Sequence, residues 1–137
     1  MSFNSELNDF TKKAGKNAEK IFRGTTINLF GRIIKRTPVV TGRLKGNWQI
    51  DVNKPPIGIL SMDDNSPLNK INSESKFKIQ RGVGKASLED TIYMANNLPY
   101  AQLVENGNYS TQAPAGMVGV TAAEFEREIE RQAGKVK

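Results

Sequence analysis

Hydrophobic residues recur every three or four positions through the first 36 residues of the chain. The residues that carry this period are Phe3, Leu7, Phe10, Ala14, Ala18, Ile21, Phe22, Leu29 and Ile33. This spacing predicts a helix with one apolar face. From Ile21 onward the apolar arc widens, so we expect the second half of the helix to lie on a sheet and the first half to project. The helix should end at Thr37-Pro38, because proline disfavours helical backbone in the residue before it.

The predicted helix over residues 1–36 is long for the size of the chain. At about 1.5 Å per residue it would extend on the order of 50 Å, whereas the whole chain has only 137 residues. The remaining residues could not cover such a helix along its full length. Gly24, Asn28 and Gly31 share one helical face, and each glycine in a helix costs about 1 kcal/mol relative to alanine. We therefore expect a neighbouring backbone to approach that face closely.

The middle of the chain has the shorter period of strands. Apolar and polar residues alternate between Leu44 and Val52, which predicts a half-buried strand with Trp48 as a core anchor. Further short strands are predicted over Ile57–Met62, Lys76–Val83 and Asp90–Ala95, and Asp63–Ser75 is predicted to be a polar surface loop. The interval 43–95 should therefore form a small, mainly antiparallel sheet of three or four strands, with a loop over 63–75.

Two more helices are predicted near the C-terminus. A short one covers residues 99–106, and a longer one covers residues 118–132 after a loop. The stretch Glu124–Arg131 of the longer helix is densely charged, so we expect it to face mostly solvent. Long helix, small sheet and C-terminal helix together predict a single domain, 1–137, of the α+β class.

Charge is spread unevenly along the chain. The net charge is +6, and residues 1–50 contain ten basic residues against three acidic ones, a local balance of +7. Basic residues beside the apolar stripe of the first helix are candidate phosphate contacts: Lys12, Lys13, Lys16, Lys20 and Arg23. Such a basic face indicates either a solvated helix surface or contact with nucleic acid or an acidic protein.

Composition excludes several kinds of chemistry. The chain has no cysteine and no histidine, so disulfides, zinc-finger cages and Ser–His or Cys–His nucleophile pairs are ruled out. The acidic pairs Asp63-Asp64 and Glu89-Asp90 lack a rigid frame, and Gly82–Lys85 is only half of a phosphate-binding loop. We predict no catalytic residue, no cofactor and no metal. No run of 18 apolar residues would span a membrane, and no secretory signal begins the chain, so we expect synthesis in a cytoplasm.

Two segments carry more information than composition does. Thr37–Trp48 reads TPVVTGRLKGNW, and Asn97–Gly107 reads NLPYAQLVENG. In this order and spacing they resemble the small neck and tail-completion proteins of tailed bacteriophages, the group that includes the lambda Z-type minor tail protein. In that family a TPVDTGRLRxSW stretch follows the first helix, and a PYAxxLExG stretch precedes a loop and the last helix. Val40 stands where the family usually has Asp, which removes any polar contact that the Asp would make.

The resemblance implies a structural role without enzymatic activity. Proteins of this kind form rings at the head–tail junction of the virion, between the head-closure ring and the tail tube. By analogy we expect a homo-oligomer, a hexameric ring, with head-closure or connector proteins and tail terminator or tail tube proteins as partners. Non-specific contact with packaged DNA is compatible with that position. The polar loop 63–75 would become ordered on docking to the next ring.

The resemblance and the apolar stripe together predict interface residues. They are Phe3, Leu7, Phe10, Thr37, Pro38, Thr41, Gly42, Arg43, Pro99, Tyr100 and Glu105. Simpler interpretations stay open: Thr37-Pro38 as a helix stop, Gly42 as a turn residue, and Pro99-Tyr100 as the entry to a helix. Arg43 is hypothesised to pair with Glu105 across a subunit boundary. The alternative function is a basic domain that binds nucleic-acid phosphates, and steep salt dependence would distinguish it.

Overall fold

The computed structural model describes residues 3–39, 41–61, 66–107 and 110–136, with the backbone alone over 3–13. Six helices and two strands follow one another in this part of the chain. They are α1 (Phe3–Arg36), α2 (Arg43–Gly46), β1 (Trp48–Val52), α3 (Leu68–Val83), β2 (Ile92–Asn96), α4 (Ala101–Glu105), α5 (Val118–Ala122) and α6 (Phe125–Lys135). The α+β class predicted from the sequence is confirmed.

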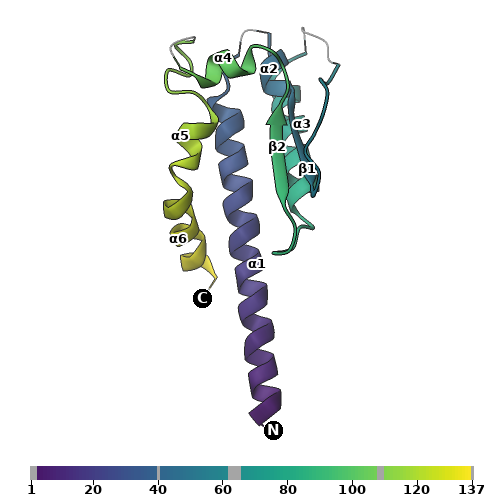
Figure 1. Cartoon of the computed structure of the whole chain (residues 1–137), viewed down its shortest axis with the longest axis vertical. Coiled ribbons are helices and arrows are strands. Elements are labelled where there is room, and N and C mark those ends of the chain that lie inside the picture. Colours follow the sequence, from purple (N-terminus) through teal and green to yellow (C-terminus); the bar gives the residue numbers. More distant parts are fainter. Residues whose placement is uncertain (1–2, 40, 62–65, 108–109, 137) are drawn as a thin grey trace.

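Helix α1 is the axis of the molecule. Helices α5 and α6 lie along one side of it, the sheet and α3 lie along the other, and its N-terminal part extends beyond all of them (Figure 1). Both the length of this helix and its end before Pro38 agree with the prediction. The prediction that the second half of α1 lies on the sheet was wrong, because this half packs chiefly against α6 and α3.

The sheet of the described residues has two strands rather than the three or four predicted. Strands β1 and β2 are antiparallel, with Trp48 opposite Asn96 and Val52 opposite Ile92. The strand predicted from Leu44 begins only at Trp48, because Arg43–Gly46 form the helical turn α2. That turn is closed by the Gly46 amide, which donates to the carbonyl of Gly42 at 2.9 Å.

Helix α3 replaces a predicted loop and a predicted strand. Of the loop 63–75, residues 63–65 lie outside the described part, while Leu68 onward is helical, and so is the expected strand Lys76–Val83. The buried residues are four apart, which marks one face of a helix: Ile71, Ser75, Ile79 and Val83. Polar residues fill the positions between them, and the serine interrupts the apolar series that would have identified the helix.

The segment predicted as a strand over Ile57–Met62 has no strand in its described part, residues 57–61. Side-chain amides hold it instead. Asn47 exchanges two hydrogen bonds with the Leu60 backbone, at 2.8 and 3.3 Å. Gln49 and Asn97 both donate to the Gly58 carbonyl at 2.9 Å. These contacts satisfy backbone groups that a further strand would otherwise pair.

The C-terminal helix predicted over 118–132 is two helices. Helix α5 ends at Ala122, and α6 begins at Phe125 and continues to Lys135. The short helix predicted over 99–106 is confirmed as α4. The two C-terminal helices follow the flank of α1 in succession (Figure 1), so the break between them lets the chain stay in contact with a straight axis.

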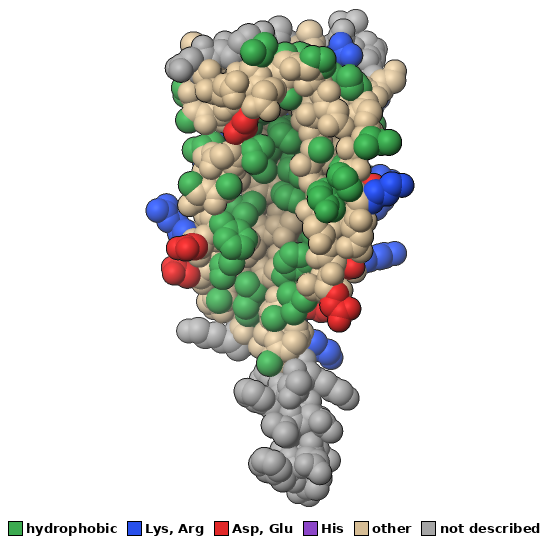
Figure 2. Space-filling view, in the orientation of Figure 1, with side chains coloured by type: hydrophobic (Ala, Val, Ile, Leu, Met, Phe, Trp, Pro, Cys, Tyr) green, Lys and Arg blue, Asp and Glu red, His purple; other side chains and the backbone are tan. Residues whose placement is uncertain are grey.

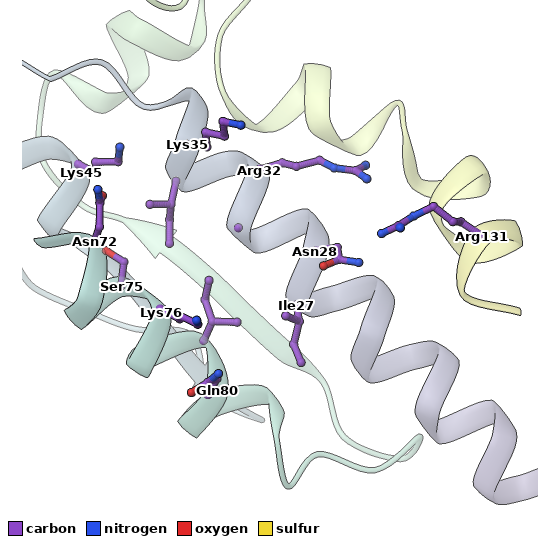
Figure 3. Close-up of a pocket in the computed structure, with 13 residues that line it drawn as sticks. Ile27, Asn28, Arg32, Lys35, Lys45, Asn72, Ser75, Lys76, Gln80 and Arg131 are labelled. Atoms are coloured by element: carbon purple, nitrogen blue, oxygen red, sulfur yellow. The ribbon is translucent and has the colours of Figure 1, made fainter. Parts of the chain in front are cut away.

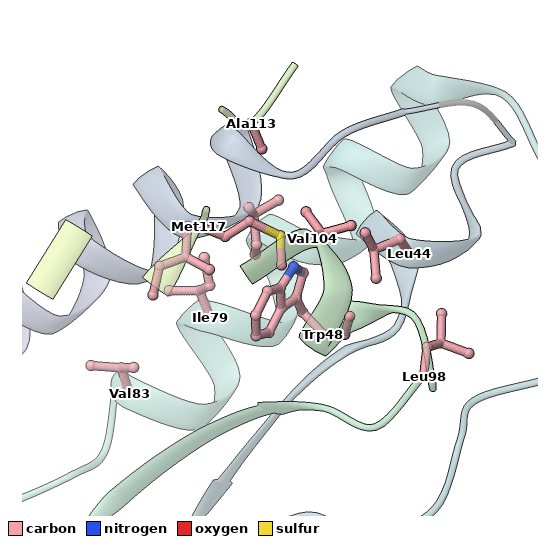
Figure 4. Packing of buried hydrophobic residues seen from close by; sticks show 11 residues of the cluster. Leu44, Trp48, Ile79, Val83, Leu98, Val104, Ala113 and Met117 are labelled. Carbon is pink, nitrogen blue, oxygen red and sulfur yellow. The ribbon is translucent and has the colours of Figure 1, made fainter. Parts of the chain in front are cut away.

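The core is centred on Trp48, as the alternating pattern predicted. This residue is 4% exposed and lies among side chains from helices α1 to α4 and from the loops that flank α4, including Leu44, Val104 and Met117 (Figure 4). Its indole Nε1 donates to the Thr37 hydroxyl at 2.8 Å, and that hydroxyl in turn lies 2.8 Å from the Ile33 carbonyl, to which it donates. A buried indole N–H needs such a partner, so the end of α1 and the start of β1 are fixed together.

Candidate assembly surface

The two sequence motifs meet at the end of the molecule opposite the N-terminus. Helices α2 and α4, which belong to one motif each, lie there together (Figure 1). A hollow of about 320 Å³ is lined from both sides, by Pro38, Thr41, Gly42 and Leu44 of the first motif and by Tyr100 and Val104 of the second. The side-chain amide of Asn96, the residue just before the second motif, donates a hydrogen bond of 2.7 Å to the Leu44 carbonyl of the first.

Most of the first motif serves the fold. Thr37 and Pro38 are buried, and Thr37 holds Trp48. Gly42 has a φ of 85°, which other residues rarely adopt, and a Cβ there would collide with Ile71. Thr41 and Arg43 are the exposed members of this set, so they are the ones that a partner could reach.

In the second motif, Glu105 has an intramolecular role. Its carboxylate accepts hydrogen bonds from three successive backbone N–H groups, those of Met117, Val118 and Gly119, at 2.8 to 2.9 Å. Burial raises the pKa of this carboxyl, but the three hydrogen bonds outweigh burial and hold the pKa below its ordinary value. Glu105 therefore ties α4 to the start of α5.

The hypothesised pair between Arg43 and Glu105 has to compete with that arrangement. The Glu105 carboxylate already has three donors inside its own chain, whereas Arg43 is exposed with no ion pair among the described residues. Reversing the charge of Glu105 would break the α4–α5 connection as well as any contact between subunits. Pro99 is exposed and Tyr100 is half-buried, as expected for a turn into α4.

A buried carboxylate joins α1 to α6, and sequence reasoning missed it. Glu128 is 2% exposed, although its stretch was predicted to face solvent. Its oxygens accept hydrogen bonds from four side chains at 2.7 to 2.9 Å, namely Asn28, Arg32, Arg131 and Gln132. The Arg131 guanidinium is the main cause of a pKa far below the ordinary value; burial opposes it, and the other three donors reinforce it.

The helical face shared by Gly24, Asn28 and Gly31 was the available signal for this contact. Asn28 of α1 donates to Glu128 of α6, and Gly24 of α1 leaves room for the side chain of Gln132, which also belongs to α6. The close approach expected at this face occurs at Gly24, where a side chain rather than a backbone makes it, and not at Gly31, which has nothing within 4 Å of an added Cβ. Farther along α1, Arg36 donates to the Thr121 hydroxyl at 2.7 Å and pairs with Glu124.

The candidate phosphate contacts differ in their surroundings. The side chains of Lys12 and Lys13 lie outside the described part, as do those of Phe3, Leu7 and Phe10, and Lys16 and Lys20 are exposed. Arg23 donates to the Ala86 carbonyl at 2.7 Å and pairs with Glu19 at 3.6 Å. Its guanidinium thus holds α1 to the chain that follows α3.

Hydrophobic side chains gather in a strip on one face of the molecule, between α5 and α6 on one side and β2 on the other (Figure 2). Two hollows lie along this strip, one between β2, α4 and the start of α5, and the other between α1 and α6. One, of about 270 Å³, is lined by Met94, Met117 and Val118 among others. The second, of about 240 Å³, is lined by Phe22 and Phe125 among others. We call this strip the apolar face, and define it by the four residues among these that are not buried, namely Phe22, Met94, Val118 and Phe125.

The apolar face is open to solvent in the single chain. Val118 is 40% exposed and Phe125 is 49% exposed. Over the described residues no group of three or more acidic side chains could hold a metal ion, and no helix there is long and apolar enough to cross a membrane. The exposed apolar side chains offer surface for packing.

Comparison with known proteins gives one match. A family model described as "Bacteriophage HK97-gp10, putative tail-component" matches residues 2–107. No curated protein and no solved structure matches the chain. The matched region contains α1, the sheet and both sequence motifs, and it ends just after α4.

Proposed function

Since the chain belongs to the HK97-gp10-like family of bacteriophage tail components, we propose that it is a structural subunit that forms an oligomeric ring at the head–tail junction of the virion. The exposed apolar face is the observation that supports association between copies of the chain. Burying such a surface is favourable by roughly 25 cal/mol per Å² before ordering costs. A chain with this face uncovered gains stability when a second copy covers it.

The projecting part of α1 supplies a second, different surface. It extends beyond the rest of the subunit (Figure 1), and its sequence contains Phe3, Leu7 and Phe10 at helical spacing. When one patch of a subunit binds a different patch of the next, the assembly closes into a ring if the rotation permits. In this proposal, the projecting helix of one copy covers the apolar face of its neighbour.

Position and stoichiometry are further parts of the proposal. A hexameric ring would match the expected partners, which are head-closure or connector proteins on one side and tail terminator or tail tube proteins on the other. The exposed residues Thr41, Arg43 and Pro99, at the far end of the subunit, are where such a partner would dock. Packaged DNA would touch the ring through Lys16 and Lys20, both exposed on α1.

A substitution in the apolar face tests this proposal. Phe125→Glu places a charge at a half-exposed position, so the monomer should fold while the contact between copies is lost. We expect phage that carry this substitution to yield few joined, tailed particles. The matched control is Phe77→Glu on α3, where Phe77 is 60% exposed and carries Arg81 above its ring. Equal yields from the two substitutions would contradict the proposal.

A further inference from the structure

A groove of about 680 Å³ runs between α1 and α3, with Lys45 of α2 at one end and Arg131 of α6 at the other (Figure 3). Five of its lining residues are cationic: Arg32, Lys35, Lys45, Lys76 and Arg131. None of its lining residues is acidic. The lining residues themselves therefore supply no counter-charge.

Part of that charge is compensated within the chain. Glu128 binds Arg32 at 2.7 Å and Arg131 at 2.8 Å. The three lysines make no ion pair in the part of the chain that the structure describes. The uncompensated charge thus lies toward the α2 end of the groove, away from Glu128.

Two buried residues lie at the α2 end of the groove, and the hydroxyl of one of them lacks a hydrogen-bond partner. Lys45 is only 8% exposed, and burial lowers the pKa of its ammonium. Ser75 is 3% exposed, and its hydroxyl lines the groove without a hydrogen-bond partner. Buried polar groups of native proteins are nearly always hydrogen-bonded. A hydroxyl without a hydrogen-bond partner and an ammonium without an ion pair line the same groove, and together they point to an anion that binds there.

We propose that this groove binds a carboxylate-bearing segment of a neighbouring protein. Ammonium and hydroxyl groups donate to carboxylate oxygens, and such charge-assisted hydrogen bonds are the strong ones. The groove also has aliphatic walls from Ile27, Ile34 and Ile79, which suit an apolar side chain beside the acid. The occupant is therefore an acidic, partly aliphatic polypeptide segment.

A nucleic-acid backbone fits the groove less well. Lys45 is recessed between α1 and α3, whereas a duplex contacts cations that protrude from a surface. A phosphodiester chain also has no apolar side chain that would pack against the isoleucines of the groove. The groove is separate from the apolar face, so this binding property does not require a ring, and a negative result here would leave the proposed ring untested.

Binding of a labelled hexaglutamate peptide to the full chain, followed by fluorescence anisotropy, tests the proposal. We expect the Lys35→Gln, Lys45→Gln double variant to bind the peptide roughly tenfold more weakly than the unaltered chain does. The matched control is Lys54→Gln, Lys85→Gln, which removes the same charge at exposed positions outside the groove. Equal affinity of the two double variants, or no binding by the unaltered chain, would overturn the proposal.

Ser75→Ala gives a separate readout. Removing a buried hydroxyl that has no partner should leave the melting temperature unchanged or slightly higher, while peptide affinity falls about fivefold. A residue with only a structural role would not show this split. Unchanged affinity in Ser75→Ala would remove the hydroxyl from the site and contradict the proposal as stated.

Two competitors identify the occupant. A thymidine hexanucleotide should displace the peptide less effectively than unlabelled hexaglutamate, and more effective displacement would assign the groove to nucleic acid. The chain has its own acidic pair, Asp63-Asp64. Replacing both with Asn should leave peptide affinity unchanged, whereas a large gain would assign the groove to this pair and overturn the proposal of a partner.

Discussion

Single residues hold the subunit together at points that are far apart in the sequence. Glu128 connects α6 to α1 through Asn28 and Arg32, which are about 100 residues away in the chain. Glu105 connects α4 to α5 through three backbone N–H groups. Both carboxylates have a lowered pKa in the folded state, so both favour folding only while they are ionised.

Substituting Glu128 should be costly. In Glu128→Gln the charge is lost and the two guanidiniums keep no counter-charge at this position, so we expect a loss of about 2 kcal/mol in the free energy of unfolding. The melting temperature should fall on the order of 8 °C. Glu130→Gln, two residues farther along α6 and exposed, is the control and should change little.

The same residue predicts a pH dependence. The pKa of Glu128 is lowered from its ordinary value of 4.5, so its contribution is fully present above that pH and is lost as the pH falls toward the folded-state value. Thermal unfolding should therefore show a difference between the unaltered chain and Glu128→Gln that is large at pH 7 and shrinks below pH about 4. A difference that stayed constant with pH would mean that the carboxylate charge is not what stabilises the contact.

Gly42 is a residue at which the backbone needs glycine. Its φ of 85° strains any other side chain, and a Cβ there meets Ile71, so Gly42→Ala should cost about 1–3 kcal/mol in the free energy of unfolding. Gly15→Ala, in the open part of α1 where nothing lies near the added Cβ, should be neutral or stabilising. Denaturant unfolding of the two variants measures the contrast, and an equally stable Gly42→Ala would contradict it.

At the scale of elements, α1 divides into a part that belongs to the core and a part that projects. The core contacts of α1 begin at Ile27 and Phe30. Deleting residues 2–13 should therefore leave the melting temperature nearly unchanged and should abolish the assembly of joined particles. A large drop in melting temperature would show that the projecting part supports its own subunit instead.

Substitutions in the projecting part of α1 can distinguish a role in packing between subunits from a role in phosphate binding. Replacing Lys12, Lys13, Lys16 and Lys20 with Gln removes the basic face of α1 and leaves Phe3, Leu7 and Phe10 in place. We expect joined particles to form at the usual yield. Loss of assembly in this variant, together with DNA binding by the unaltered chain that weakens steeply with salt, would support the nucleic-acid alternative.

Elements with a local signal were predictable from the sequence. Helix α1 has a sustained period and ends at Pro38, and β2 has a short apolar run between polar turns. Helix α3 was missed because Ser75 interrupts its buried face, and its other buried positions also fit a strand when they are viewed a few residues at a time. The break in the C-terminal helix has no local signal, since α5 and α6 are positioned by the flank of α1.

Site residues were predictable to the extent that their roles are local. Gly42 and the turn at Thr37-Pro38 could be recognised from the residue types alone. The role of Glu128 could not, because a glutamate in a charged run looks solvated until α1 is placed beside it. The basic groove was missed for the same reason, since Lys45 and Ser75 come together only when α2 and α3 flank α1.

At the scale of the whole molecule, the account depends on how copies pack in the phage particle. The subunit has an apolar face on one flank and a projecting helix at one end (Figures 1 and 2). Family membership associates the chain with the tail, and the pairing of these two surfaces is what would make it a ring.

Electron cryomicroscopy of intact particles is the most direct measurement. We predict several copies of the chain arranged around the tail axis at the head–tail junction, with α1 of each copy against the apolar face of the next. Density that placed the chain elsewhere, or copies whose apolar faces stayed open to solvent, would contradict the account.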